Sequence, residues 1–213
     1  AASNVYIFRN TSISGVISFS SATNYNTGPV AYALAVGDVD DDGKPDLVTG
    51  HNNGGTSNSI YILRNTTTGP GSITFGPLIS IPVNVTNAYG GVALGDLNND
   101  GKLDIVSVAK GTNEVSVLRN TSSTGNLSFV PISNLVTSAG PRGVDIGDIN
   151  GDGKLDIVCA SFSSLNVAVF KNSTTSSLSI SFTDRADYLA TGTPANDVGN
   201  TVSLADFNGD GKL

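Results

Sequence analysis

A nine-residue pattern, Asp-x-Asp/Asn-x-Asp-Gly-x-x-Asp, occurs three times in this chain of 213 residues and begins a fourth time before Leu213. The copies occupy residues 38–46, 96–104, 148–156 and 206–213. Their first aspartates are separated by 58, 52 and 58 residues. An internal period of this length indicates one supersecondary unit that is repeated along the chain.

Each copy places oxygen atoms at alternating positions of a tight turn. Positions one, three, five and nine carry carboxylates or an amide, and position seven offers its backbone carbonyl. About six to eight hard oxygen ligands suit Ca²⁺, and the glycine at position six permits the sharp turn. The predicted metal ligands are Asp38, Asp40, Asp42, Lys44 and Asp46; Asp96, Asn98, Asp100, Lys102 and Asp104; Asp148, Asn150, Asp152, Lys154 and Asp156; and Asp206, Asn208, Asp210 and Lys212. The lysines contribute only backbone oxygen, and the fourth copy lacks position nine.

An EF-hand is the main alternative for such a loop. It requires a glutamate at position twelve and flanking helices. Position twelve is here Thr49, Ser107 or Cys159, and the residues after each loop are typical of a strand. Asp, Asn and Gly are also ordinary turn residues, but four copies in one register favour metal binding.

Charge is concentrated in the four loops, which hold 13 of the 18 acidic residues of a chain with formal net charge −7. Four Ca²⁺ ions would nearly cancel the net negative charge of the four loops, with their lysines counted. The acidity therefore does not require a cationic partner. An acidic chain without a basic patch is not expected to bind nucleic acid, and no segment is long and apolar enough to span a bilayer. Sparse charge, 14% of residues, with many turn residues favours a secreted or cell-surface protein.

One repeat is predicted to form four short strands. In the second repeat they are predicted at 91–96, 104–109, 114–120 and 127–131. In the other repeats the fourth strand is predicted at 17–19, 73–75 and 180–182. No segment shows a helical period over ten residues, so the sequence predicts an all-β fold, a β-propeller built from four-stranded blades.

The loops, with their preceding Gly-Asp and following Asp-Ile-Val, resemble FG-GAP/VCBS-type repeats. This family builds the calcium-binding propeller of integrin alpha subunits and of many bacterial secreted proteins. The resemblance implies a ring of about seven blades, with Ca²⁺ in the loop between strands one and two. It implies as ligands the aspartate and asparagine side chains of the four loops.

The repeat phase makes 1–213 a single propeller region. It is expected to contain a half blade at 1–22, blades at 31–80, 90–134 and 142–183, and the start of another at 202–213. About four repeats are fewer than the usual ring holds. The chain is therefore expected to belong to a larger propeller, to close as a four-bladed ring, or to form an open array that associates with copies of itself.

The predicted function is an extracellular calcium-binding propeller with a structural or adhesive role. The alternatives are a self-assembling subunit of a filament, and a lectin-like module that binds glycan or cell-surface protein. Tyr32 and Tyr89 would line a sugar-binding face or pack between blades. An enzyme, a propeller lyase or hydrolase, is the remaining alternative and is not expected, because one histidine (His51) and one cysteine offer no nucleophilic triad. No catalytic residue and no cofactor besides Ca²⁺ is assigned.

Several further residues have two interpretations. Sequons, read either as turn chemistry or as a glycosylated surface, occur at Asn10, Asn65, Asn84, Asn120, Asn126 and Asn172. His51 is expected in a loop, and Cys159 is expected to be a buried, inert thiol. Asp184, Asp187 and Asp197 are expected in a linker, as solvated groups or a carboxylate pair.

Overall fold

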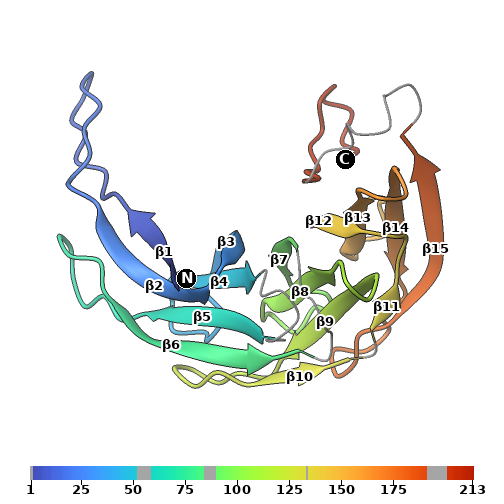
Figure 1. Ribbon diagram of the computed structural model, residues 1–213, viewed down its shortest axis with the longest axis horizontal. Helices are drawn as coiled ribbons and strands as arrows, with labels where there is room; N and C mark the ends of the chain where they lie inside the picture. Colours follow the sequence, from blue (N-terminus) through green and yellow to red (C-terminus); the bar gives the residue numbers. More distant parts are fainter. Residues whose placement is uncertain (1, 52–58, 84–89, 133, 191–200) are drawn as a thin grey trace.

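The computed structural model of the protein describes residues 2–51, 59–83, 90–132, 134–190 and 201–213. These residues contain strands, turns and no helix, which confirms the all-β prediction. The strands form antiparallel sheets that follow one another along an open arc (Figure 1). The repeats fit propeller blades, and the described residues do not close into a ring.

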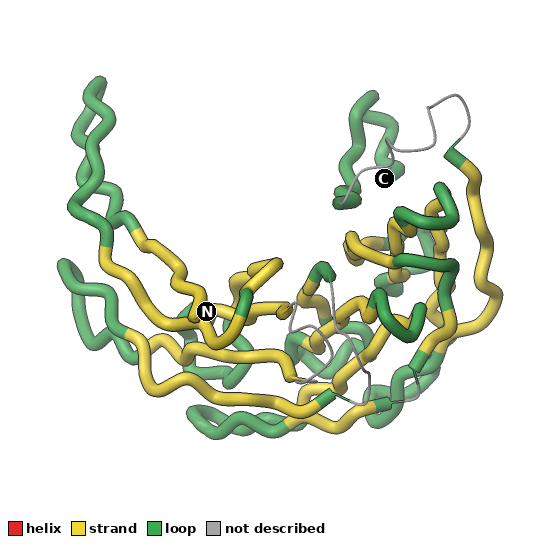
Figure 2. Tube along the Cα trace, in the orientation of Figure 1, coloured by secondary structure: helices red, strands yellow, loops and turns green. Residues whose placement is uncertain are grey.

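Each repeat folds into an antiparallel sheet in which consecutive strands pair, except that the short strand Leu135–Val136 pairs with Glu114–Asn120. Figure 2 shows the strands alternating with loops along the chain. The first sheet pairs β1 (Ala2–Ile7) with β2 (Thr23–Pro29). The second contains β3 (Ala31–Gly37), β4 (Asp46–His51), β5 (Ser59–Asn65) and β6 (Phe75–Pro82). The third contains β7 (Val92–Gly95), β8 (Asp104–Ala109), β9 (Glu114–Asn120), β10 (Phe129–Pro131) and β11 (Leu135–Val136). The fourth contains β12 (Pro141–Gly147), β13 (Asp156–Ser161), β14 (Asn166–Asn172) and β15 (Phe182–Leu189).

The core lies between neighbouring sheets. The second strand of each full blade is buried along its whole length, which explains why its sequence is apolar on both faces. One apolar cluster joins the first and second full blades through residues such as Val48 and Ile105. Another joins the second and third through residues such as Val106 and Ile157. Cys159 belongs to this second cluster and is fully buried, as predicted, and burial raises the pKa of its thiol to about 11.

A glycine at the end of each first strand allows the repeats to approach closely. A Cβ on Gly37 would lie 2.6 Å from Cδ1 of Leu103 in the next repeat. A Cβ on Gly147 would lie 2.6 Å from Cδ1 of Leu213. The leucine at position eight of a loop therefore packs against the equivalent glycine of the preceding repeat at both of these contacts between repeats.

The predicted position of the fourth strand is wrong in part. The first sheet uses 23–29 rather than 17–19, and β6 and β15 begin where the predicted strands end. The predicted residues lie in a narrow hairpin held by paired hydroxyls, for example Thr66 to Thr74 at 3.2 Å. Regular pairing begins only after this hairpin. Residues 202–213, predicted to begin another blade, contain no strand.

His51 is not a loop residue as predicted, because it ends β4 and is buried. Its Nδ1 contacts the carbonyl of Pro29, its Nε2 lies 2.8 Å from the Thr49 hydroxyl, and its ring packs on Tyr61. Asp184 and Asp187 lie on β15 rather than in a linker, and Asp187 pairs with Arg185. Asn84, Tyr89 and Asp197 lie outside the described residues. No helix in the described part of the chain is long and apolar enough to cross a membrane.

Candidate metal centre

All four acidic loops adopt one turn, built by the carboxylate at position one. In the first loop Asp38 accepts hydrogen bonds from the backbone N–H groups of Asp42 and Gly43, at 3.2 and 2.7 Å. The same two bonds recur in the loops that begin at Asp96, Asp148 and Asp206. The turn is therefore a property of the nine-residue pattern itself and forms even in the fourth loop, which lacks position nine.

The turn needs two residues in the left-handed region. The first is the predicted glycine at position six, with φ between 81° and 85° in the four loops. The second is position four, which sequence reasoning missed: Asp41, Asn99, Gly151 and Gly209 have φ of 58°, 56°, 74° and 75°. Only Asp, Asn and Gly occupy this position, and these residues tolerate the left-handed conformation best. That restriction was a readable signal in the sequence.

The carboxylate at position nine connects the loop to the sheet. Oδ2 of Asp46 accepts from the N–H of Val39 at 3.1 Å, and Oδ1 accepts from the N–H of Asn65 at 2.8 Å. Asp104 and Asp156 make the corresponding bonds in the next two repeats. All three aspartates are at most 1% exposed. Position nine thus ties the start of the loop to the end of the third strand.

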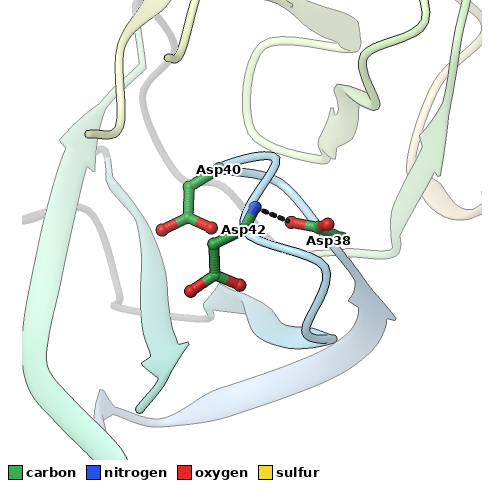
Figure 3. Close-up of side chains that lie close together, drawn as sticks. All are labelled: Asp38, Asp40 and Asp42. Atoms are coloured by element: carbon green, nitrogen blue, oxygen red, sulfur yellow. Dashed lines mark hydrogen bonds between the residues drawn. The ribbon is translucent and has the colours of Figure 1, made fainter. Parts of the chain in front are cut away.

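Three predicted ligands converge in the first loop. One oxygen each from Asp38, Asp40 and Asp42 lies within 4.8 Å of the others (Figure 3). Asp46 is not a member of this group. In the other loops position three is an asparagine, so the described residues show no further cluster of three carboxylates. The structure therefore brings positions one, three and five together most clearly in the first loop.

The position-three oxygens give the strongest indication that the loops fit a cation. Oδ1 of Asp40 and Oδ1 of Asn98 are buried and have no hydrogen-bond partner among the described residues. Asp40 is 0% exposed and Asn98 is 4% exposed. An unpartnered buried oxygen is energetically costly, and a cation in the loop would satisfy it. The residues present therefore fit a hard divalent ion. In the third and fourth loops the corresponding oxygens of Asn150 and Asn208 accept backbone N–H groups instead.

Cationic side chains already lie beside some of these carboxylates. The guanidinium of Arg64 pairs with Asp40, and Nζ of Lys44 lies 3.0 Å from Oδ2 of Asp42. In the third loop, Nζ of Lys171 lies 3.8 Å from Asp152. The position-seven lysines also donate their backbone N–H to the position-five carboxylate, at 3.0 to 3.1 Å in all four loops.

Burial and hydrogen bonding shift the loop carboxylates in opposite directions. Burial raises the pKa of Asp46 and of Asp104 from 3.8 to about 6, helped by the neighbouring loop carboxylates and opposed by their backbone donors. Backbone N–H donors, that of Gly153 foremost, lower the pKa of Asp148. The N–H of Gly211 has the same effect on the pKa of Asp206. Backbone donors therefore favour the ionised form of Asp148 and Asp206, whereas burial disfavours the ionised form of Asp46 and Asp104.

The comparisons with known proteins agree with this geometry. The family model described as FG-GAP-like repeat matches three times, at residues 38–107, 96–159 and 148–213. No curated protein matches the chain. The three matches together run from the first acidic loop to Leu213 and cover most of the chain, and repeats of this kind are typical of extracellular proteins. This protein therefore belongs to the family of FG-GAP-like repeat proteins.

Proposed function

We propose that this chain is an extracellular propeller that Ca²⁺ stabilises and that has a structural or adhesive role. The proposal rests on one observation above all. The carboxylates of Asp38, Asp40 and Asp42 converge, and the buried Oδ1 of Asp40 has no partner among the described residues. A hard cation with oxygen ligands would both neutralise the cluster and satisfy that atom.

The proposed ligands follow the repeat. Positions one, three and five contribute side-chain oxygens, and position seven contributes its backbone carbonyl. The two oxygens of Asp46 and of Asp104 each accept one N–H in the structure, and Oδ2 of Asp156 accepts a second one, from Nδ2 of Asn150. An ionised carboxylate has about four acceptor sites, so Asp46, Asp104 and Asp156 keep capacity for an ion. The fourth loop offers only Asp206, Asn208, Asp210 and the carbonyl of Lys212.

The expected contribution of Ca²⁺ binding to the free energy of unfolding is modest for one loop and considerable for several. An extracellular-type site with a Kd of roughly 0.1 mM, at about 1 mM Ca²⁺, adds about 1.4 kcal/mol to stability. Three such sites would together approach the lower end of the total stability of a domain. The ion would therefore serve the fold directly, by holding each loop between the first two strands of its blade.

Thermal unfolding in 1 mM CaCl₂ and in EDTA tests this proposal. We expect EDTA to lower the Tm by roughly 10 °C, from about 4 kcal/mol of lost binding energy, and to increase protease sensitivity. Asp100→Asn should reduce the difference between the Tm in CaCl₂ and the Tm in EDTA. The matched control is Asp184→Asn, which removes the same charge from an exposed position on β15 and should leave the difference unchanged. A Tm that does not respond to EDTA would contradict the proposal.

A second role, association with a further repeat unit, is supported by the exposed face of β3. Leu34 is 47% exposed, whereas the corresponding residues of the next two repeats, Val92 and Val144, are each 8% exposed. In those repeats the preceding blade covers the residue. We propose that another unit of the same kind, from a longer chain or from another copy, covers Leu34 and its neighbours Tyr32 and Val36. Analytical ultracentrifugation of wild type and Leu34→Ser tests association between copies, and a concentration-independent monomer would exclude it.

A further inference from the structure

One buried asparagine links each acidic loop to the loop of the preceding repeat. Asn120 is the last residue of β9 and is 2% exposed. Its Nδ2 donates to the carbonyl of Leu103, at position eight of its own loop, at 2.8 Å. The same nitrogen donates to the carbonyl of Val39, at position two of the preceding loop, at 2.9 Å. A single amide group therefore holds two consecutive loops together.

The link recurs at the next joint. Asn172, at the end of β14, is 0% exposed. Its Nδ2 donates to the carbonyl of Leu155 in its own loop at 2.9 Å and to the carbonyl of Leu97 in the preceding loop at 2.8 Å. Its Oδ1 accepts the N–H of Thr174 at 2.9 Å, so every polar atom of the side chain is used. A repeated geometry at equivalent positions shows that the link belongs to the repeat unit.

The backbone of each asparagine extends the connection to the proposed ligands. The N–H of Asn120 donates to Oδ1 of Asp104, and Oδ2 of Asp104 accepts the N–H of Leu97. The carbonyl of Leu97 then accepts from Asn172, whose N–H donates to Asp156. An unbroken series of hydrogen bonds thus passes through the position-nine carboxylates of successive loops.

A second set of contacts reaches position three of the preceding loop. The N–H of Gly125, in the hairpin of the second full blade, donates to the carbonyl of Asp40 at 3.0 Å. The side chain of Asn98 donates to the carbonyl of Ser177, in the hairpin of the third. The first and second proposed ion sites are therefore each bordered by the hairpin of the following repeat.

We propose that Asn120 and Asn172 are positioning residues that make the loops bind divalent cations as a coupled set. An ion that orders one loop fixes the carbonyl to which the next asparagine is bonded, so the second loop loses less conformational freedom when it binds. The coupling is reciprocal. This inference rests on the proposed function, because it presupposes that the loops bind the ion.

The amides of the position-six glycines offer one probe for each loop. The N–H groups of Gly43, Gly101 and Gly153 donate to the position-one carboxylates at 2.7 to 2.8 Å. Their ¹H–¹⁵N resonances should report the occupancy of each loop during a CaCl₂ titration of the whole chain. With the first loop disabled by Asp38→Ala and Asp42→Ala, we expect the midpoint of Gly101 to rise about fivefold or more.

Substituting the asparagine tests the route of the coupling. In Asn120→Ala, disabling the first loop should no longer move the midpoint of Gly101. Asn65→Ala is the matched control, because Asn65 holds the same position on β5 but, among the described residues, its Nδ2 donates only to Pro45 of its own loop. That variant should keep the coupling between the first and second loops. Asn172→Ala should remove only the coupling between the second and third loops.

The outcomes separate the two proposals. If no glycine resonance responds to CaCl₂, the proposed function fails. If the resonances respond but disabling the first loop leaves the Gly101 midpoint unchanged in the otherwise wild-type chain, the coupling is refuted while calcium binding stands. If Asn65→Ala abolishes the coupling as completely as Asn120→Ala, general destabilisation explains the effect and the positioning role is refuted. The first comparison needs no asparagine variant, so it decides the matter even if Asn120→Ala does not fold.

Discussion

The guanidinium of Arg64 lies against the carboxylate of Asp40, to which its Nε donates a hydrogen bond. The same guanidinium lies 3.8 Å from Oδ2 of Asp42. A positive charge therefore stands beside the carboxylates that are proposed to bind Ca²⁺. It reduces their mutual repulsion in the metal-free chain, and it would repel an incoming cation.

Replacing this arginine should strengthen binding in the first loop. We expect Arg64→Gln to lower the Kd of that loop about fivefold, an effect of about 1 kcal/mol, and to destabilise the chain in EDTA. The measurement is a CaCl₂ titration followed at the amide of Gly43. The control is Arg119→Gln, because Arg119 occupies the equivalent position on β9 but donates to the carbonyl of Leu178. Unchanged affinity in Arg64→Gln would show that the arginine does not oppose the ion.

The pKa of Asp104 should depend on the ion. Burial, with the nearby carboxylates of Asp100 and Asp96, raises this pKa from 3.8 to about 6. Because the folded pKa lies above the unfolded one, the metal-free folded chain binds this proton more tightly. The contribution of protonated Asp104 to folding stability therefore grows as the pH falls through about 6 towards 4. Ca²⁺ favours the ionised form and should lower the pKa.

Carbon-13 NMR of the aspartate carboxyl groups measures this directly. In EDTA, Asp104 should titrate near pH 6 and Asp148 below 3.8, because backbone donors lower the pKa of Asp148. The pH dependence of denaturation alone would be ambiguous, because His51 also titrates. Burial lowers the pKa of His51, so the contribution of the neutral imidazole to folding stability is lost as the pH falls below 6.5. An Asp104 resonance that titrates near 3.8 in EDTA would contradict the prediction.

Gly91 should be intolerant of a side chain. Its N–H donates to the carbonyl of Arg142 at 2.6 Å, and an added Cβ would lie 2.9 Å from the backbone nitrogen of Val144. Neither atom belongs to a flexible side chain, so Gly91→Ala must separate two neighbouring sheets. We expect Gly91→Ala to lower the free energy of unfolding, measured by urea denaturation, by about 1–3 kcal/mol. Gly69→Ala, where a Cβ would meet nothing within 4 Å, should change stability by less than about 0.5 kcal/mol.

Two of the six sequons should carry no glycan in the folded protein. Asn120 and Asn172 are buried, and the Nδ2 atom that a glycan would modify donates to two carbonyls in each case. Asn10 and Asn126 are exposed. After secretion from a glycosylating host, peptide mass spectrometry should find glycan at Asn126 and none at Asn120 or Asn172. Asn126→Gln is the control for assigning the modified peptide, and a folded chain with glycan on Asn172 would overturn the prediction.

Much of the blade could be predicted because its signals are local. The predicted third strand at 114–120 coincides with β9, and the second at 104–109 coincides with β8. Their apolar runs and bounding turns lie within a few residues of one another. The fourth strand was misplaced because alternation continues through the hydroxyl-bonded hairpin, where residues such as Thr74 show the pattern of a strand. His51 was misassigned because its burial depends on Tyr61 and Pro29, which reach it only in the folded sheet.

The sequence alone determined the four acidic turns, because the carboxylate at position one and the residues it holds lie within six consecutive positions. It also determined that the chain is a repeat protein. Only the tertiary structure decided what the asparagine after the third strand does. In the sequence, Asn120 looks like a turn residue or a sequon. In the structure it is bonded to Val39, 81 residues away, because stacking of the blades brings two loops to the same buried amide.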